Sequence, residues 1–357
     1  MTRRWSQPST RITFSCCVYT VHMIGQVKRR HHTVPKVLLL GFVDSKNRLA
    51  MRRRDGSNLL TSLNDASVRG DFYSYRDSDG VLVDEVETWL GDGIESPVAE
   101  VLVRARRGEQ LASNDVVHLA RLAASGLLRT PTIRSYLDQL DAHLGPLLLM
   151  HRHLTAAAVD PTALSPEAMK RVHATAATVW NDCDKLSANE QSKLRTFLRE
   201  FDKLSQRLST WSWNVLTAKH PCLITADAPV VTLGTDDGGW HGVLPKGSPV
   251  FIPVSSRHLL IGEQHPIGRG SFTIELAKMV NIRMTSEAYD AVFADPIMPW
   301  PDHIVLGPRR PTLPHPTVTW SRSQPGSEPT FPTAYPAVED DRVRALLDSL
   351  GAVDTVE

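Results

Sequence analysis

Four polar side chains in short motifs have the types and positions that catalysis or binding requires: His31, His32, Arg129 and Asp227. The two histidines open the run 31–35, whose proline, Pro35, biases the preceding backbone toward an extended conformation. Adjacent side chains of an extended segment point to opposite faces, so the two rings are not expected to reach the same ion. One histidine could still serve as a metal ligand, a general base or a phosphate contact. The alternative is that each ring hydrogen-bonds a neighbouring loop.

Asp227 and Arg129 are each expected at the end of an element, where functional side chains are common. Asp227 follows a short apolar strand and precedes a turn that contains Pro229, so it either enters a cleft or caps its own turn. Arg129 ends an expected helix, where the helix dipole alone favours a cation, although a guanidinium there could also clamp a carboxylate or phosphate. With Glu95 from an acidic helix, His31 and Asp227 form a candidate ligand set for a divalent metal.

The composition is that of an ordinary globular protein and excludes several classes. The chain has 357 residues, of which 41% are hydrophobic and 22% are charged, so a wholly disordered chain, a collagen-like fibre and a disulfide-stapled mini-protein are excluded. The formal net charge of +1 does not support nucleic-acid binding, although a local basic cluster such as Arg52-Arg53-Arg54 could contact phosphates. The sequence has no glycine-rich nucleotide loop, no His-Glu-x-x-His and no Gly-x-Ser-x-Gly motif.

The hydropathy of the chain and the spacing of its cysteines indicate the cellular compartment. No apolar run reaches the roughly 20 residues needed to cross a bilayer, so no membrane partner is expected. The four cysteines include no Cys-x-x-Cys pair and fit a reducing cytoplasm. The segment 12–24 resembles a short signal-peptide core, but polar residues interrupt it and no cleavage site follows. We therefore expect a cytoplasmic protein that starts at Met23, with residues 1–27 as an extension outside the fold.

The elements that must position these side chains change along the chain: residues 28–82 are β-rich, 83–210 helical and 211–295 β-rich again. In the first part, Val37–Leu40 and Phe72–Tyr75 are expected among short strands. In the middle part, Ser96-Pro97 and Thr130-Pro131 each predict a helix start, as N-cap and first helical residue. Further helices are expected from Ser113-Asn114-Asp115 onward, and over 165–184, 187–209 and 272–289. Later strands are expected at 222–225, 230–233, 250–253, 258–261 and 291–294.

Segregated rather than alternating strands and helices predict an α+β fold and not a doubly wound parallel sheet. We expect residues 28–295 to form a single discontinuous domain, with the pairing of its two β-rich parts left open. The proline density of residues 296–337 predicts an extended tail. A short terminal helix is expected within residues 338–357.

The order of these motifs resembles that of the domain of unknown function 4238 family, which is widespread in bacteria. The matching segments are the His-His-x-Val-Pro box at 31–35, a Phe-Tyr element at 72–73, an acidic helix with Glu85, Glu87 and Glu95, an Arg-Thr-Pro break at 129–131, the strand-turn 224–230, and a helix with Asn281 before the strand 291–293. The likeness covers about residues 28–295 and supports Met23 as the start. Ala226 replaces the family's usual serine, which removes a hydroxyl from the strand-turn. Because the family is uncharacterised, the resemblance implies no activity.

Two functions of different class fit these motifs. The first is a hydrolase, metal-assisted if a divalent ion is bound, that acts on a phosphoester or a nucleic acid. In this function His31 or His32, Glu95, Asp227 and Arg129 would converge in one site. The histidine would be a metal ligand or a base, the carboxylates would be metal ligands, and Arg129 would bind the negative charge of the substrate. The second is a non-enzymatic binding or regulatory protein, in which the same residues are caps and buried hydrogen-bond partners. Convergence in one cleft favours the first function, and scattered, individually satisfied side chains favour the second.

Overall fold

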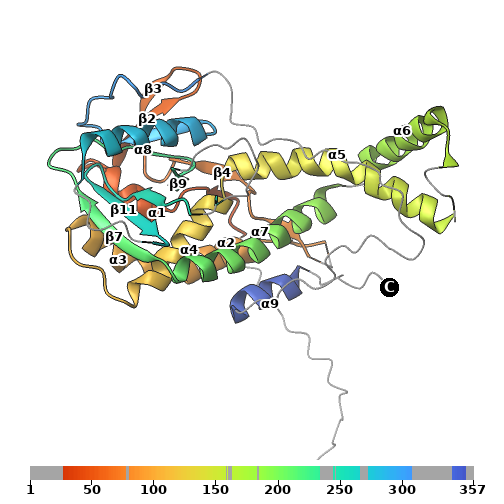
Figure 1. Cartoon of the computed structure of the whole chain (residues 1–357), viewed down its shortest axis with the longest axis horizontal. Coiled ribbons are helices and arrows are strands. Elements are labelled where there is room, and N and C mark those ends of the chain that lie inside the picture. The colour runs from red at the N-terminus through yellow and green to blue at the C-terminus, as the bar shows by residue number, and fades with distance from the viewer. Residues whose placement is uncertain are drawn as a thin grey trace, which may run out of the picture.

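The computed structural model (Figure 1) describes residues 27–77, 80–157, 159, 163–182, 185–233, 244–245, 247–265, 272–307 and 340–350. Nearly all of the expected extension at 1–27 and most of the expected tail at 296–337 lie outside these residues. Within them the chain combines helices with antiparallel strands, so the predicted α+β fold is confirmed.

Helices fill the middle of the chain, and most strands lie before or after them. The α-helices are α1 (Lys36–Leu39), α2 (Glu85–Leu90), α3 (Ser96–Arg106), α4 (Asp115–Leu128), α5 (Pro131–Ala156), α6 (Pro166–Asp182), α7 (Lys185–Ser209), α8 (Ile274–Glu287) and α9 (Asp341–Ser349). The strands are β1 (Arg30–His32), β2 (Arg48–Arg53), β3 (Asn58–Ser62), β4 (Val68–Gly70), β5 (Tyr75–Arg76), β6 (Leu82–Val83), β7 (Ser212–Thr217), β8 (Thr225–Ala226), β9 (Val231–Thr232), β10 (Val250–Pro253), β11 (His258–Glu263) and β12 (Ala291–Ala294). The strands predicted at 250–253, 258–261 and 291–294 are confirmed, whereas those at 222–225 and 230–233 are replaced by the two-residue strands β8 and β9.

Two four-stranded sheets and two two-stranded ribbons account for the strands of the described residues. One sheet has the order β7-β11-β10-β9 and comes from the C-terminal part alone. The other has the order β3-β2-β12-β8, in which Met51 of β2 pairs with Phe293 of β12. The sequence left open whether the two β-rich parts pair, and the β2–β12 ladder joins them in one sheet.

The sheet β3-β2-β12-β8 separates two hydrophobic clusters, because successive residues of a strand point to opposite faces. Met51 and Phe293 belong to a large cluster that includes residues of α2, α3, α4 and α7. Val292 and Ala294, on the other face, belong to a second cluster with residues of α8 and β11. The sheet is therefore covered on both faces, which holds its strand ends in fixed positions.

Helices α5 and α6 form an arm that projects from the body of the molecule (Figure 1). Helix α5 starts in the body, where Thr130 Oγ1 accepts a hydrogen bond of 3.2 Å from the backbone N–H of Ile133, so the Thr-Pro helix start is confirmed. Farther along, the two helices share a small separate cluster that includes Met150. The terminal helix α9, predicted within 338–357, packs against α7 and α2.

The predicted extended run Val37–Leu40 is wrong, because this segment is helical. Helix α1 starts after Pro35, whose carbonyl oxygen accepts hydrogen bonds from the backbone N–H groups of Leu38 and Leu39. A 3₁₀ turn, Leu40–Phe42, continues it. The buried residues Leu38, Leu39 and Phe42 follow helical spacing, and their burial outweighs the β propensity of the run.

Two other local predictions are also wrong. Phe72 and Tyr73 lie in a turn that follows Asp71, whose φ of 50° breaks the strand, so pairing begins only at β5. Helix α3 does begin at Ser96, with Pro97 in its first turn, but Ser96 is not its N-cap, because a π-helical turn (Gly91–Glu95) joins α2 to α3 without a break. A π turn accommodates an interruption of the helical hydrogen-bond ladder, such as the missing N–H of Pro97.

The turn after α1 packs closely against the chain where strand β10 ends. The addition of a single methyl group to this turn tests the contact. A Cβ atom at Gly41 would lie 1.8 Å from the carbonyl oxygen of Val254. We expect Gly41→Ala to lower the free energy of unfolding, measured by urea denaturation, by about 3 kcal/mol. Gly91→Ala is the matched control, because a Cβ there meets no atom within 4 Å and the residue is helical; it should be neutral or stabilising by up to about 1 kcal/mol. Equal losses in both variants would contradict the close contact.

Candidate functional site

A pocket of about 480 Å³ lies between strand β1 and helix α2. Its wall on the β1 side is cationic and its wall on the helix side is acidic, and the lining residues are Lys28, Arg30, His32, Lys36, Asn64, Glu87, Gly91 and Glu95. Two of the residues singled out from the sequence, His32 and Glu95, are among them. A volume of this order is typical of small-molecule sites.

His31 points away from this pocket and is fully buried. Its Nδ1 accepts a hydrogen bond of 2.8 Å from the backbone N–H of Tyr73, and its Nε2–H donates to the carbonyl oxygen of Lys28 at 2.7 Å. The ring also stacks on that of Tyr73, with 5.6 Å between the centroids. Both nitrogens are therefore engaged, and burial lowers the pKa of His31, so the ring stays neutral. His31 thus holds the backbone of Lys28, a lining residue of the pocket, and it matches the expected alternative in which the ring hydrogen-bonds a neighbouring loop.

His32, one residue on, faces the pocket. Its Nδ1–H donates to the carbonyl oxygen of Ala66 at 3.1 Å, which leaves the lone pair on Nε2. Burial lowers the pKa of His32 to about 4, and the charge of Lys36 lowers it as well. The ring is therefore uncharged at neutral pH and can accept a hydrogen bond from a ligand. The predicted divergence of the two histidines is confirmed.

Arg129 lies behind the acidic wall, at the C-terminal end of α4, and its side chain has no exposed surface. Its Nη2 donates to Glu95 Oε1 at 3.1 Å. Among the described residues, Nε and Nη1 of Arg129 and the hydroxyl of Tyr73 have no hydrogen-bond partner. A buried guanidinium needs a counter-charge, which Glu95 supplies from the pocket wall.

Glu87 also has a pKa far from its ordinary value. Burial raises the pKa of Glu87 to about 7, and the nearby Glu95 raises it further. Arg129, Lys28 and a hydrogen bond from the backbone N–H of His32 oppose this rise. A carboxyl group whose pKa lies near neutrality can both take up and release a proton at physiological pH, as general acid–base catalysis requires.

Sequence reasoning named Glu87 only as part of the acidic helix in the family resemblance and did not place it among the candidate site residues. The signal that could have found it is spacing: Glu87, Gly91 and Glu95 are four residues apart along one continuous helix, so they share a face. Lys28 and Lys36 carry no motif, and no sequence signal marked them.

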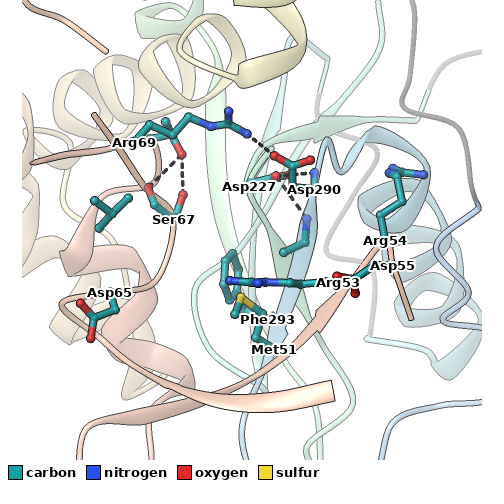
Figure 2. Close-up of a pocket in the computed structure, with 13 residues that line it drawn as sticks. Met51, Arg53, Arg54, Asp55, Asp65, Ser67, Arg69, Asp227, Asp290 and Phe293 are labelled. Atoms are coloured by element: carbon teal, nitrogen blue, oxygen red, sulfur yellow. Dashed lines mark hydrogen bonds and ion pairs between the residues drawn. The ribbon is translucent and has the colours of Figure 1, made fainter. Parts of the chain in front are cut away.

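Asp227 lines a different and larger cavity, shown in Figure 2. Its Oδ1 accepts a hydrogen bond of 2.7 Å from the backbone N–H of Tyr289, and its Oδ2 accepts from those of Asp290 and Ala291 at 2.7 and 3.3 Å. Burial raises the pKa of Asp227 to about 6, and these three hydrogen bonds hold the rise back. The carboxylate thus ties the end of β8 to the start of β12, rather than the backbone of its own turn.

The structure therefore brings His32, Glu95 and Arg129 together and places His31 and Asp227 elsewhere. The proposed metal ligands His31, Glu95 and Asp227 do not meet. In the part of the chain that the structure describes, no group of three or more His, Cys, Asp or Glu side chains is arranged to hold a metal ion. No step of a mechanism is assigned to a metal on these residues.

A family model described as "Protein of unknown function (DUF4238)" matches residues 30–296. The chain belongs to the DUF4238 family. No curated protein matches the chain, and neither does any solved structure. The matched range of this DUF4238 protein holds the lining of both cavities except Lys28, whereas α9 lies beyond it. A search of the described residues found no helix with the length and apolar character of a membrane span.

The titration of Glu87 makes the stability of the DUF4238 protein depend on pH. The folded-state pKa of Glu87, about 7, lies above its ordinary value of 4.5, so the folded state binds the proton more tightly. This contribution to stability is complete below pH 4.5 and is lost as the pH rises through 7. We expect Glu87→Gln to raise the free energy of unfolding by about 1–3 kcal/mol at pH 8, with little change at pH 5.

The measurement is urea denaturation at the two pH values, with Glu100→Gln, an exposed glutamate of α3, as the control. The control should change neither value by more than about 0.5 kcal/mol. A Glu87→Gln variant that is less stable than the parent protein at pH 8 would show that the carboxylate stabilises the fold, against this interpretation.

Proposed function

We propose that this DUF4238 protein is a phosphoester hydrolase whose catalytic centre is the 480 Å³ pocket. The observation that carries the proposal is the position of Glu87, a carboxyl group with a pKa of about 7, in a pocket where cationic side chains outnumber carboxylates. A phosphoester is an anion that needs cationic partners, and its hydrolysis needs a base to activate water.

The cationic wall suits a phosphate group because its side chains are already positioned. Arg30 Nη2 is held by Asp65 Oδ1 at 2.7 Å, and Lys36 Nζ donates to Asn64 Oδ1 at 3.0 Å. The backbone of Lys28, though not its ammonium group, is held by hydrogen bonds to His31 and Asp84. Such preorganised charges stabilise a developing negative charge without rearranging during the reaction.

In the proposed mechanism Glu87 accepts a proton from water as the water oxygen attacks phosphorus. The ester P–O bond breaks, and the leaving oxygen takes a proton from solvent. Lys28 and Lys36 stabilise the charge on the phosphoryl oxygens, and the neutral Nε2 of His32 accepts a hydrogen bond from the substrate or the water. Arg129 acts as a positioning residue, since it holds Glu95 and moderates the pKa of Glu87.

A non-enzymatic binding role is the second candidate, and specific observations favour it. His31 and Asp227 are each engaged with backbone groups, and Arg129 is paired with Glu95, so three motif residues have structural partners. The same pocket could then hold an anionic ligand without turnover. Because the pocket is small, a nucleic acid remains a candidate ligand only if its terminal phosphate alone enters the pocket. The cytoplasmic location stays a prediction.

Turnover of p-nitrophenyl phosphate and bis(p-nitrophenyl) phosphate by the full chain separates these functions. We expect activity to rise with pH through about 7, as Glu87 loses its proton. Glu87→Gln should lower kcat by about 10²–10⁴-fold, with KM nearly unchanged. Glu100→Gln, the exposed control, should retain full activity.

Binding of inorganic phosphate, measured by calorimetry, completes the test. Saturable binding that is weakened by Lys36→Gln, together with no turnover of either ester, would support the binding role and reject the hydrolase. Turnover that survives in Glu87→Gln would reject the assignment of Glu87 as the base.

A further inference from the structure

The cavity of Figure 2, of about 1060 Å³, is a second concave region of the molecule. It lies between the sheet β3-β2-β12-β8 and the segment from Asp65 to strand β4. The sheet contributes two cross-strand pairs, Met51 with Phe293 and Arg53 with Ala291. Since residues two apart on a strand share a face, these four side chains form one surface of the cavity.

The floor of this cavity is apolar. Met51 and Phe293 are almost fully buried, with 6% and 1% of their surface exposed, and Val68 joins them from the facing ribbon. Figure 2 shows the Arg53 side chain beside Met51 and Phe293. A ligand that entered here would meet apolar surface below and a guanidinium at the mouth.

Most charged groups around the cavity are already engaged. Their partners are as follows: Arg69 pairs with Asp290, Arg54 donates to backbone carbonyls, Asp55 accepts from Ser57, Asp65 accepts from Arg30, and Asp227 accepts from three backbone N–H groups. Arg53 differs: its charge lowers the pKa of the neighbouring Asp55 carboxyl, but no hydrogen bond or direct ion pair joins its guanidinium to any residue in the described ranges. Its N–H groups are therefore left to bind a ligand.

The balance of charge around the cavity limits which anions could bind there. Carboxylates outnumber guanidiniums in the lining, so a doubly charged phosphate ester would be repelled more strongly than a monoanion. A guanidinium binds a carboxylate through two parallel hydrogen bonds, and the apolar floor offers burial to a hydrocarbon body. This cavity thus differs from the catalytic pocket, where cations prevail.

We propose that this cavity is a separate binding site for a small carboxylate with an aromatic or branched aliphatic body. The carboxylate pairs with Arg53, and the body packs on Met51 and Phe293. The proposal stands apart from the hydrolase, because the two pockets share no lining residue.

Titration of the full chain with phenylacetate, followed by ligand-observed NMR, tests this site. We expect saturable binding at millimolar concentration, and at least tenfold weaker binding of the uncharged isostere 2-phenylethanol, as for the loss of one charged hydrogen-bonded pair. Arg53→Gln should weaken phenylacetate binding by the same factor. Arg107→Gln, an exposed arginine outside both cavities, should not change it.

A second variant tests the cavity without a change of charge. Ala291→Leu should fill space beside Arg53 and weaken phenylacetate binding, with its fold verified by circular dichroism. Glu87→Gln should bind phenylacetate as the parent protein does, whatever happens to phosphoester turnover. Equal binding of phenylacetate to the parent protein and Arg53→Gln, equal affinity for 2-phenylethanol, or no saturable binding would each overturn the proposal.

Discussion

The burial of one guanidinium organises the pocket between strand β1 and helix α2. The Arg129 side chain has no exposed surface, and a buried charge without a partner would cost several kcal/mol. Glu95 supplies the counter-charge, and the π turn that joins α2 to α3 carries it to the pocket wall. Since Arg129 stands where α4 meets α5, the pair also links segments that are distant along the chain. The same positive charge restrains the pKa of Glu87, so the fold and the chemistry of the pocket share one electrostatic cause.

Strand β1 then distributes the residues of the His-His box among different environments. His31 turns into the core and binds two backbone groups, while His32 turns to the cation-rich pocket. Thr33, the next residue, lines the larger cavity. A segment of three residues therefore contributes to the core and to two cavities of opposite charge balance. The alternation of side chains in an extended chain separates His31 from His32, and the bend that follows β1 takes Thr33 to the larger cavity.

Local signals predicted much of this architecture. The Thr130-Pro131 helix start, the helix that follows residues 113–115 and the divergence of His31 and His32 all depend on neighbours within a few residues. The titration of Glu87 was beyond such reasoning, because strand β1, Lys28 and Arg129 create its environment from distant parts of the chain. The same limit explains the proposed metal set, which joined Asp227 to His31 on residue type alone. The prediction of an extended run at 37–40 was wrong for a related reason. Tertiary burial decides between helix and strand in a short apolar segment.

The β2–β12 ladder has a consequence for how the protein forms during synthesis. Strand β2 lies near the start of the fold, and its partner β12 leaves the ribosome only after helices α1 to α8. Helices α4 and α7, which pack against each other, lie between them and can associate earlier. Until β12 arrives, Ala50 and Met51 of β2 lack the strand beside them, and the N-terminal hairpin β2–β3 has an open edge. The nascent chain thus depends on late, non-local pairing, a step that is slow and exposed to aggregation.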